Sequence, residues 1–187
     1  MRKSSLAALA VASVVLPATC IASESHGPGY DFVEAGWARL HAGHDGGGFA
    51  ANVSISVSDQ AFFYGNGTFV DFGHGAGSAD AIRGGMGFHT PVNDRWDFVV
   101  RGAIQHIDEG HKSYGMQAEG GVKGKFTPQL EAWLMAGRSN WRDEHFADQA
   151  FVRAGLLYEF NHHWGVTVDV VSGSHETEYF AGVSYLF

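Results

Sequence analysis

The chain has 187 residues and a formal net charge of −8 at pH 7, with 12 lysines and arginines against 20 aspartates and glutamates. This acidic balance argues against a nucleic-acid-binding protein and against a polybasic anchor for a membrane surface. The 26 glycines accompany 13% aromatic residues and only 4 prolines, so the composition is that of a folded chain rather than a disordered one.

The N-terminus has the three parts of a secretory signal peptide. Arg2 and Lys3 are positively charged, residues 6–16 are apolar, and residues 18–22 are mostly small. The apolar run is shorter than the ~20 residues that a membrane-spanning helix needs. We therefore predict a signal peptide over residues 1–22.

Cleavage after Ala22 would remove Cys20, the only cysteine of the chain. Lipidation of Cys20 is the alternative, but the preceding Pro17 makes the run-up a poor lipoprotein signal. Residues 23–187 are enough for one domain and too few for two well-packed ones.

From about residue 30 to the last residue, apolar and polar side chains alternate with a period of two, and no helical period is sustained. The clearest case is residues 49–57, where the odd positions are apolar and the even positions are small or polar. Ten such runs predict ten strands, at residues 30–40, 49–57, 61–72, 80–89, 96–107, 113–126, 130–141, 149–160, 164–172 and 177–187. Aromatic and small residues occupy both parities of 61–72 and 130–141, so the facing of these two strands stays open.

The connections between the runs alternate in type. Short turns are expected at 58–60, 90–95, 127–129 and 161–163, and the intervening connections include loops rich in glycine and histidine. Even strand numbers, short turns at one end and longer loops at the other are typical of outer-membrane barrels. The sequence thus predicts an all-β fold, a ten-stranded antiparallel transmembrane β-barrel, and a soluble sandwich or lipocalin-like barrel is the competing architecture.

The polar face of the strands favours the transmembrane alternative because opposite charges are interleaved along it. Its charged members are Glu34, Arg83, Asp97, Arg101, Glu119, Lys123, Arg153, Glu159, Asp169 and Glu178. In lipid a sheet must close on itself, and closure places these side chains in the lumen. Barrels of about this size are filled by side chains. We expect a lumen ion-pair network in a side-chain-filled lumen.

The last strand carries the most specific local pattern. Tyr179, Ala181, Val183, Tyr185 and Phe187 alternate back from the terminal aromatic residue. This resembles the terminal strand by which outer-membrane barrels are recognised by the barrel assembly machinery. We also expect Trp and Tyr residues near strand ends to supply interfacial girdles, namely Tyr30, Trp37, Trp96, Trp133, Trp164, Tyr179 and Tyr185.

Histidines occur in every predicted outer loop, and these are the candidate metal ligands. They are His41, His44, His74, His111, His145 and His175. Imidazole and carboxylate groups bind zinc and copper, but the spacing forms no compact motif. We predict no metal site and no cofactor. The alternative role is a solvated rim that titrates between pH 5 and 8.

Catalysis is a second hypothesis, because some small outer-membrane barrels are hydrolases or lipid-modifying enzymes built on His with Ser or Asp. The candidates are His74 with Ser78, and His175 with Ser172 or Ser174. Nucleophilic catalysis needs a base within hydrogen-bond reach of the nucleophile and a third group that orients the base. Nothing in the sequence fixes that geometry, so we predict a protein without catalytic activity.

Three short motifs resemble one known family. Residues 30–37, Tyr-Asp-Phe-Val-Glu-Ala-Gly-Trp, resemble the opening Tyr-x-Tyr-Val-Glu-Gly-Gly-Tyr of the diffusible-signal-factor-regulated outer-membrane proteins. Residues 161–165 resemble its Asn-x-x-Trp-Gly turn, and Leu130-Glu131 matches a pair at the same place, whereas Ala35 and Trp37 depart from the pattern. The resemblance implies an outer-membrane barrel linked to signalling, biofilm or virulence, and it supplies no catalytic residue.

Together these features predict a monomeric barrel in the outer membrane of a Gram-negative bacterium. Its expected partners are outer-membrane lipid, the assembly machinery and host or extracellular ligands at the outer loops, and nucleic acid is not among them. The expected role is structural or surface-interacting, with the five outer loops presented on a rigid scaffold.

Overall fold

The computed structural model describes residues 27–42, 44–73, 77–143 and 148–187. The predicted signal peptide, residues 1–22, therefore lies outside the described part. The ten strands are β1 (Phe32–Ala42), β2 (His44–Ser58), β3 (Ala61–Asp71), β4 (Ser78–Asn93), β5 (Trp96–Asp108), β6 (Lys112–Thr127), β7 (Leu130–Trp141), β8 (Gln149–Glu159), β9 (Trp164–Gly173) and β10 (Thr177–Leu186). In the described ranges there is no helix with the length and apolar character needed to cross a membrane.

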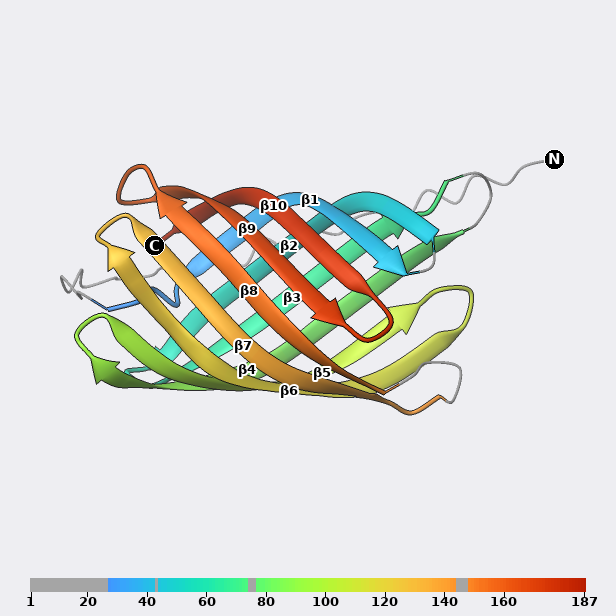
Figure 1. The fold of residues 1–187 in the computed structure, drawn as a ribbon, viewed down its shortest axis with the longest axis horizontal. Helices are drawn as coiled ribbons and strands as arrows, with labels where there is room; N and C mark the ends of the chain where they lie inside the picture. Colours follow the sequence, from blue (N-terminus) through green and yellow to red (C-terminus); the bar gives the residue numbers. More distant parts are fainter. Residues whose placement is uncertain (1–26, 43, 74–76, 144–147) are drawn as a thin grey trace.

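The strands form one closed antiparallel barrel in which each strand pairs with its neighbours in the sequence (Figure 1). The barrel closes between its first and last strands, from Phe32 opposite Leu186 to His41 opposite Thr177. Closure pairs both edges of the sheet, and this matters because unpaired backbone groups in lipid cannot bond to water. The predicted ten-stranded antiparallel barrel is confirmed.

The two ends of the barrel differ. The turn end contains the start of β1, the end of β10 and four short turns, whereas the loop end contains the five connections β1–β2, β3–β4, β5–β6, β7–β8 and β9–β10. At each short turn one side-chain oxygen accepts hydrogen bonds from the backbone N–H groups two and three residues later, at 2.9 to 3.4 Å. The accepting residues are Ser58, Asn93, Thr127 and Asn161. Such side-chain acceptors fix tight turns.

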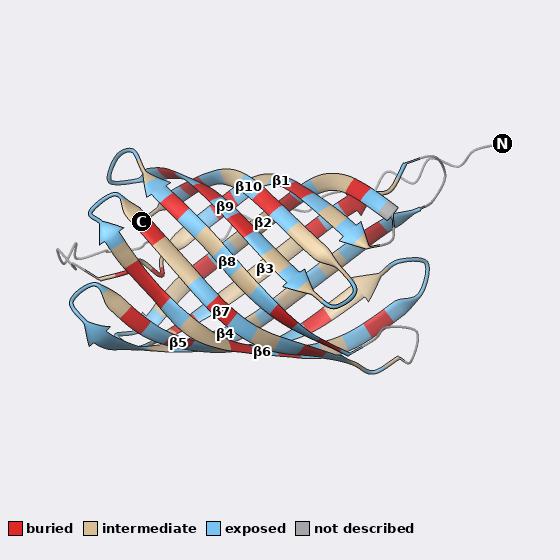
Figure 2. Ribbon diagram, in the orientation of Figure 1, coloured by how far each residue is buried: buried red, intermediate tan, exposed pale blue. Residues whose placement is uncertain are grey.

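The outer surface of the barrel is apolar and its interior is polar. Trp37, Ile104 and Leu134 are 59%, 69% and 56% exposed, whereas Glu119 and Thr167 are only 4% and 1% exposed. Along much of each strand, exposed positions alternate with buried or intermediate ones (Figure 2). A soluble barrel would have the opposite arrangement, because its apolar side chains would form the core. The sidedness is that of a transmembrane barrel.

The facing of β3 and β7, which the sequence left open, follows from apolar side chains inside the lumen. Phe62 and Met135 point inward and belong to a buried cluster with Tyr30 and Val99 near the turn end. A second buried cluster contains Ala38, Ala50, Val70 and Phe180. Aromatic residues therefore occur on both faces of β3, and hydrophobicity alone could not orient this strand.

Two strands are longer than the alternation predicts. β2 begins at His44 rather than near 49, because Gly46, Gly47 and Gly48 continue the pairing with β1, and the last two also pair with β3. A Cβ atom on Gly48 would lie 1.8 Å from the carbonyl oxygen of Phe69, so no larger residue fits this backbone. β4 continues to Asn93 through an irregularity in register after Pro91.

Candidate functional site

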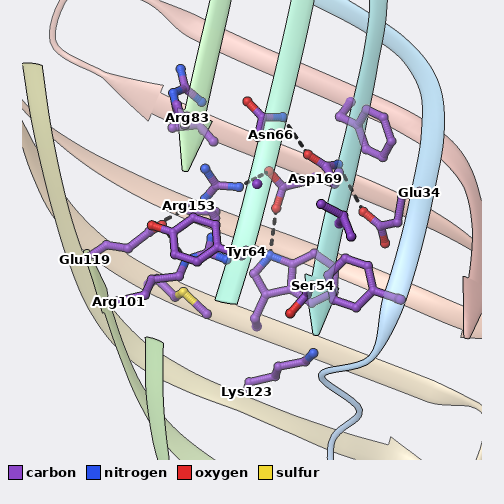
Figure 3. A pocket seen from close by; sticks show the side chains of 18 of the residues that line it. Glu34, Ser54, Tyr64, Asn66, Arg83, Arg101, Glu119, Lys123, Arg153 and Asp169 are labelled. Atoms are coloured by element: carbon purple, nitrogen blue, oxygen red, sulfur yellow. Dashed lines mark hydrogen bonds and ion pairs between the residues drawn. The ribbon is translucent and has the colours of Figure 1, made fainter. Parts of the chain in front are cut away.

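The lumen holds a cluster of three arginines and three carboxylates, each from a different strand, which we call the arginine cluster. Its members are Arg83 (β4), Arg101 (β5), Glu119 (β6), Arg153 (β8), Asp169 (β9) and Glu178 (β10). Because every second residue of a strand points inward, six single charges from six strands line one cavity, and Figure 3 labels all of them except Glu178. None of these residues is close to another in the sequence.

Glu119 connects two of the arginines. Its Oε1 lies 2.6 Å from Nε of Arg101, and its Oε2 lies 3.3 Å from Nε of Arg153. Arg153 also contacts Asp169, with 3.1 Å between Nη1 and Oδ1. The second oxygen of Asp169 accepts a 2.7 Å hydrogen bond from the Trp133 indole nitrogen. One continuous network thus ties β5, β6, β7, β8 and β9 together.

Arg83 and Glu178 form a looser pair in the same interior. Two guanidinium nitrogens of Arg83 lie 3.4 and 3.5 Å from Oε2 of Glu178, and Thr68 donates a 3.0 Å hydrogen bond to the other oxygen. The Arg101 guanidinium lies 4.9 Å from the centre of the Tyr64 ring, a cation–π distance. Tyr64 therefore packs among the charges instead of facing lipid.

Glu34 differs from the expected ion-pair network. In the described ranges it forms no salt bridge with a lysine or arginine, and its carboxylate accepts hydrogen bonds from Thr167, Ser184 and Asn52 at 2.8, 3.0 and 3.1 Å. Asn52 in turn accepts a 2.6 Å hydrogen bond from Asn66. Neutral donors on β2, β9 and β10 satisfy Glu34, which is why a nearby cation is not required.

The remaining predicted network residues lie at the turn end. Lys123 pairs with Glu131 at 2.9 Å, and Glu159 pairs with Lys125 at 3.3 Å. Asp97 lies 2.8 Å from Nδ1 of His89 and has no lysine or arginine partner among the described residues. Glu131 and His89 were missed by the sequence reasoning. The inward parity of Glu131 was hidden because the facing of its strand was ambiguous.

A segment before the barrel wall closes the turn end from inside; we call residues 27–31 the plug segment. The Tyr30 hydroxyl donates a 2.9 Å hydrogen bond to Asp97, and its ring stacks on His89 at 3.9 Å between centroids. The Lys123 ammonium lies 4.6 Å from the centre of the Tyr30 ring. Tyr30 is therefore an interior residue, and its expected place in an aromatic girdle is wrong.

Trp133 also departs from the expected girdle, because its indole points inward to Asp169. The other five predicted girdle residues include Trp37, Trp164, Tyr179 and Tyr185, which are 59%, 45%, 46% and 39% exposed. Tyr179, Ala181, Val183, Tyr185 and Phe187 all face outward, as the alternation of the last strand predicts. Their role in assembly stays a prediction.

Side chains do not fill the whole interior. A cavity of about 110 Å³ lies between the plug segment and the Phe180 side of the lumen. It is lined by Tyr30 and Lys123 at one end, by the arginine cluster, and by Glu34, Tyr64 and Trp133. A polar cavity needs roughly 10 to 15 Å³ of such volume to hold a water, so this cavity is large enough to be hydrated.

The loop end brings no metal site together in the part of the chain that the structure describes. Three of the six histidine candidates, His44, His74 and His145, have side chains outside that part. His41 contacts Asp45 across the exposed β1–β2 hairpin, while His111 and His175 lie in two other connections. No group of three or more His, Cys, Asp or Glu residues that could hold a metal ion occurs within the described ranges.

No nucleophile and base are paired at the loop end in the described ranges. The Ser172 hydroxyl lies 3.3 Å from the Thr177 hydroxyl rather than against His175. His74, the other candidate base, lies outside the described residues. The placement of the described groups thus gives no support to the hydrolase alternative.

Glu176, in the β9–β10 connection, has a shifted pKa. Burial raises the pKa of the Glu176 carboxyl above its ordinary value, while Arg83 and a hydrogen bond from Gln149 oppose this shift. The Gln149 side-chain nitrogen donates to Glu176 at 2.6 Å. Glu176 thus links the β9–β10 connection to the start of β8.

Comparisons with known proteins concern the fold. No family model matches the sequence, and no curated protein matches it. Among solved structures the chain is similar to the KdgM porin, with 10% identity, a TM-score of 0.48, and coverage of 83% of this chain and 99% of that chain. It is also similar to Ail, the attachment invasion locus protein of Yersinia pestis, with 11% identity, a TM-score of 0.41, and coverage of 86% and 100%. At such identities no residue of either protein is matched to a residue here.

Proposed function

We propose that this protein is an outer-membrane barrel whose role is surface interaction, with five loops presented on a scaffold that its interior charges hold together. The observation that carries the proposal is the sidedness of the wall, apolar outside and ionic inside, combined with five connections at one end. Loops on a rigid scaffold are the usual place for binding residues. The proposal requires no catalysis and no cofactor.

The sequence supports the location in a Gram-negative outer membrane. Residues 1–22 have the pattern of a cleaved secretory signal, and the last strand resembles the assembly signal of such barrels. We further propose that the protein is a monomer, that the barrel assembly machinery inserts it, and that outer-membrane lipid covers its apolar surface. Nucleic acid is not a proposed partner.

The resemblance of residues 30–37 and 161–165 to the diffusible-signal-factor-regulated proteins supports a role in signalling, biofilm formation or virulence. In this proposal the ligand is extracellular or belongs to a host, and it contacts the loops. The interior network contributes by keeping the scaffold rigid.

The location is tested by fractionation and gel mobility. Outer-membrane fractions from cells expressing the full chain should contain a band that migrates differently before and after boiling, because folded barrels resist unfolding in detergent. Recovery in the soluble periplasm, with no shift on boiling, would contradict the proposal.

The orientation of the loops is tested with one epitope placed at either end. An epitope inserted after Gly110, in the β5–β6 connection, should be labelled by antibody on intact cells. The matched insertion after Pro128, in the turn between β6 and β7, should be labelled only after permeabilisation. Labelling of the Pro128 insertion on intact cells would reverse the proposed topology.

The interaction role is tested by shortening loops without touching the wall. Replacing residues 109–111 and 174–176 by two-residue turns should leave the boiling-dependent shift intact and reduce attachment or biofilm formation to the level of a deletion strain. Full retention of the wild-type phenotype by this variant, in which two of the five loop-end connections are replaced, would contradict a role for these two loops.

A further inference from the structure

The plug segment is gripped through its backbone. The Lys123 ammonium donates a hydrogen bond to the carbonyl oxygen of Gly29, and Glu131 accepts a 2.9 Å hydrogen bond from the Gly29 N–H. Lys123 and Glu131 also pair with each other at 2.9 Å. In Figure 3 the Lys123 side chain points toward the blue coil that precedes β1. The Lys123–Glu131 ion pair of the wall thus forms hydrogen bonds with both backbone polar groups of Gly29.

The contacts on either side of Gly29 complete the grip. Tyr30 inserts among Phe62, Val99 and Met135, and Pro28 is buried as well. Asp31 accepts hydrogen bonds from the backbone N–H and the hydroxyl of Ser56 at 2.6 and 2.9 Å. Asp31 also accepts a 3.3 Å backbone hydrogen bond from the N–H of Phe187, next to the β1–β10 pairing. Residues 27–30 lie outside the strand ladder, so they can leave without breaking a strand pair of the barrel wall.

Tyr30 is also one wall of the central cavity. Its side chain and Lys123 line the cavity at the turn end. Withdrawal of Tyr30 would therefore open the cavity at that end, and it would leave Asp97 without the Tyr30 hydroxyl. The plug segment thus closes the polar cavity at the turn end.

The charges of the cavity favour cations. Arg83, Arg101, Arg153 and Lys123 each have a carboxylate partner, on Glu178, Glu119, Asp169 and Glu131 respectively. Glu34 lines the same cavity without a cationic partner among the described residues. Counted as ionised groups, the side chains that line the cavity therefore include one more carboxylate than cations, and Asp97, which contacts His89, lies at the entrance.

We propose that the plug segment is a releasable gate, and that the central cavity behind it admits small cations in preference to anions when the segment withdraws. Lys123 is the latch, because it holds both the Gly29 carbonyl and Glu131. The activity is additional to the surface role of the loops and does not depend on it.

The test measures entry into the cavity at a single thiol. Val99→Cys places a thiol beside Tyr30 with little change in volume, in a chain whose native cysteine is removed by Cys20→Ser. Reaction rates with a cationic and an anionic methanethiosulfonate reagent are measured on folded protein in detergent micelles. The Lys123→Gln substitution removes the ammonium that holds the Gly29 carbonyl. The matched control is Lys125→Gln. Lys125 is on the same strand as Lys123, but it pairs with Glu159 and does not contact the plug segment.

Lys123→Gln should raise the rate with the cationic reagent about tenfold or more, the change expected from the loss of one charged hydrogen bond. The anionic reagent should gain less, and Lys125→Gln should resemble the wild type. Adding Glu34→Gln should lower the preference for the cationic reagent. An unchanged rate in Lys123→Gln would overturn the gate, and equal entry of both reagents would overturn the cation preference.

A second variant provides the test if the Lys123→Gln protein does not fold. Tyr30→Ala removes the side chain that closes the cavity while the Lys123–Glu131 pair remains, and it should accelerate the cationic reagent in the same way. Boiling-dependent gel mobility verifies that each variant is folded. A folded Tyr30→Ala protein with the wild-type rate would contradict the proposal.

Discussion

The lumen and the loop-end rim both contain ion pairs, and they differ in what surrounds the charges. In the lumen the Glu119 side chain is 1% exposed and lies between Arg101 and Arg153. At the rim the pair Arg39–Asp45 is shorter than most, at 2.6 Å, yet its side chains are 56% and 50% exposed. Burial rather than distance decides the effect of losing a partner, because bulk water screens exposed charges far more strongly than charges enclosed in the lumen.

The largest effect is expected from Glu119→Ala. The change leaves the guanidinium groups of Arg101 and Arg153 short of a partner inside the barrel, and breaking such a buried pair costs about 3 to 5 kcal/mol. The measurement is the free energy of unfolding by urea in lipid vesicles. Arg39→Ala at the rim is the control and should leave it nearly unchanged, because both side chains of that pair are exposed. Equal losses would remove the distinction between the two regions.

A charge on the apolar surface should have the next largest effect. Val168 lies midway along β9, faces outward, and pairs with Ala181 and Leu156. Val168→Arg should destabilise the inserted barrel by about 2 to 4 kcal/mol, because lipid does not solvate the guanidinium. Ser172→Arg, on the same strand and face but at the loop end, should be nearly neutral. A Val168→Arg protein as stable as wild type would argue against a lipid-covered surface.

The turn end should respond moderately to the loss of one acceptor. Asn93 accepts hydrogen bonds from the N–H groups of Arg95 and Trp96 at 2.9 and 3.1 Å. Asn93→Ala should lower the free energy of unfolding by about 1 kcal/mol, the usual net value of such bonds. Asp94→Ala in the same turn is the matched control, since its side chain is not the acceptor. The idea fails if both substitutions have the same effect.

The smallest effect is expected at Glu176. Its pKa is raised in the folded protein, so folding favours the protonated form. The stability it contributes is present below its ordinary pKa of 4.5 and is lost as the pH rises through the raised value. Glu176→Gln should therefore be more stable than wild type at neutral pH and equally stable at low pH. Unfolding curves at several pH values measure this, and a wild-type advantage at neutral pH would contradict it.

The strands could be predicted from the sequence because the wall separates lipid from a polar lumen. Apolar and polar residues therefore alternate with a period of two along each strand. The alternation does not predict the facing of a residue where both faces of the strand have apolar surroundings. Phe62 and Trp133 are aromatic and inward, since the lumen near the turn end is packed with rings. Gly46 to Gly48 resemble a loop in the sequence, because glycine has no side chain that could show an alternation. In the fold, glycine is needed at Gly46 and Gly48 because β3 lies too close to leave room for a Cβ atom.

The amino-acid sequence by itself determined the number of strands, the alternation of lipid-facing and lumen-facing residues and the set of charges that share the inner face. Only the tertiary structure decided which charges are partners. Glu34 received neutral donors, Lys123 received Glu131, and residues 27–31 entered the lumen, since closing ten tilted strands brings together inward positions that are up to 150 residues apart. The period of two in each strand specifies a face, and the shear of the closed barrel specifies the neighbours across it.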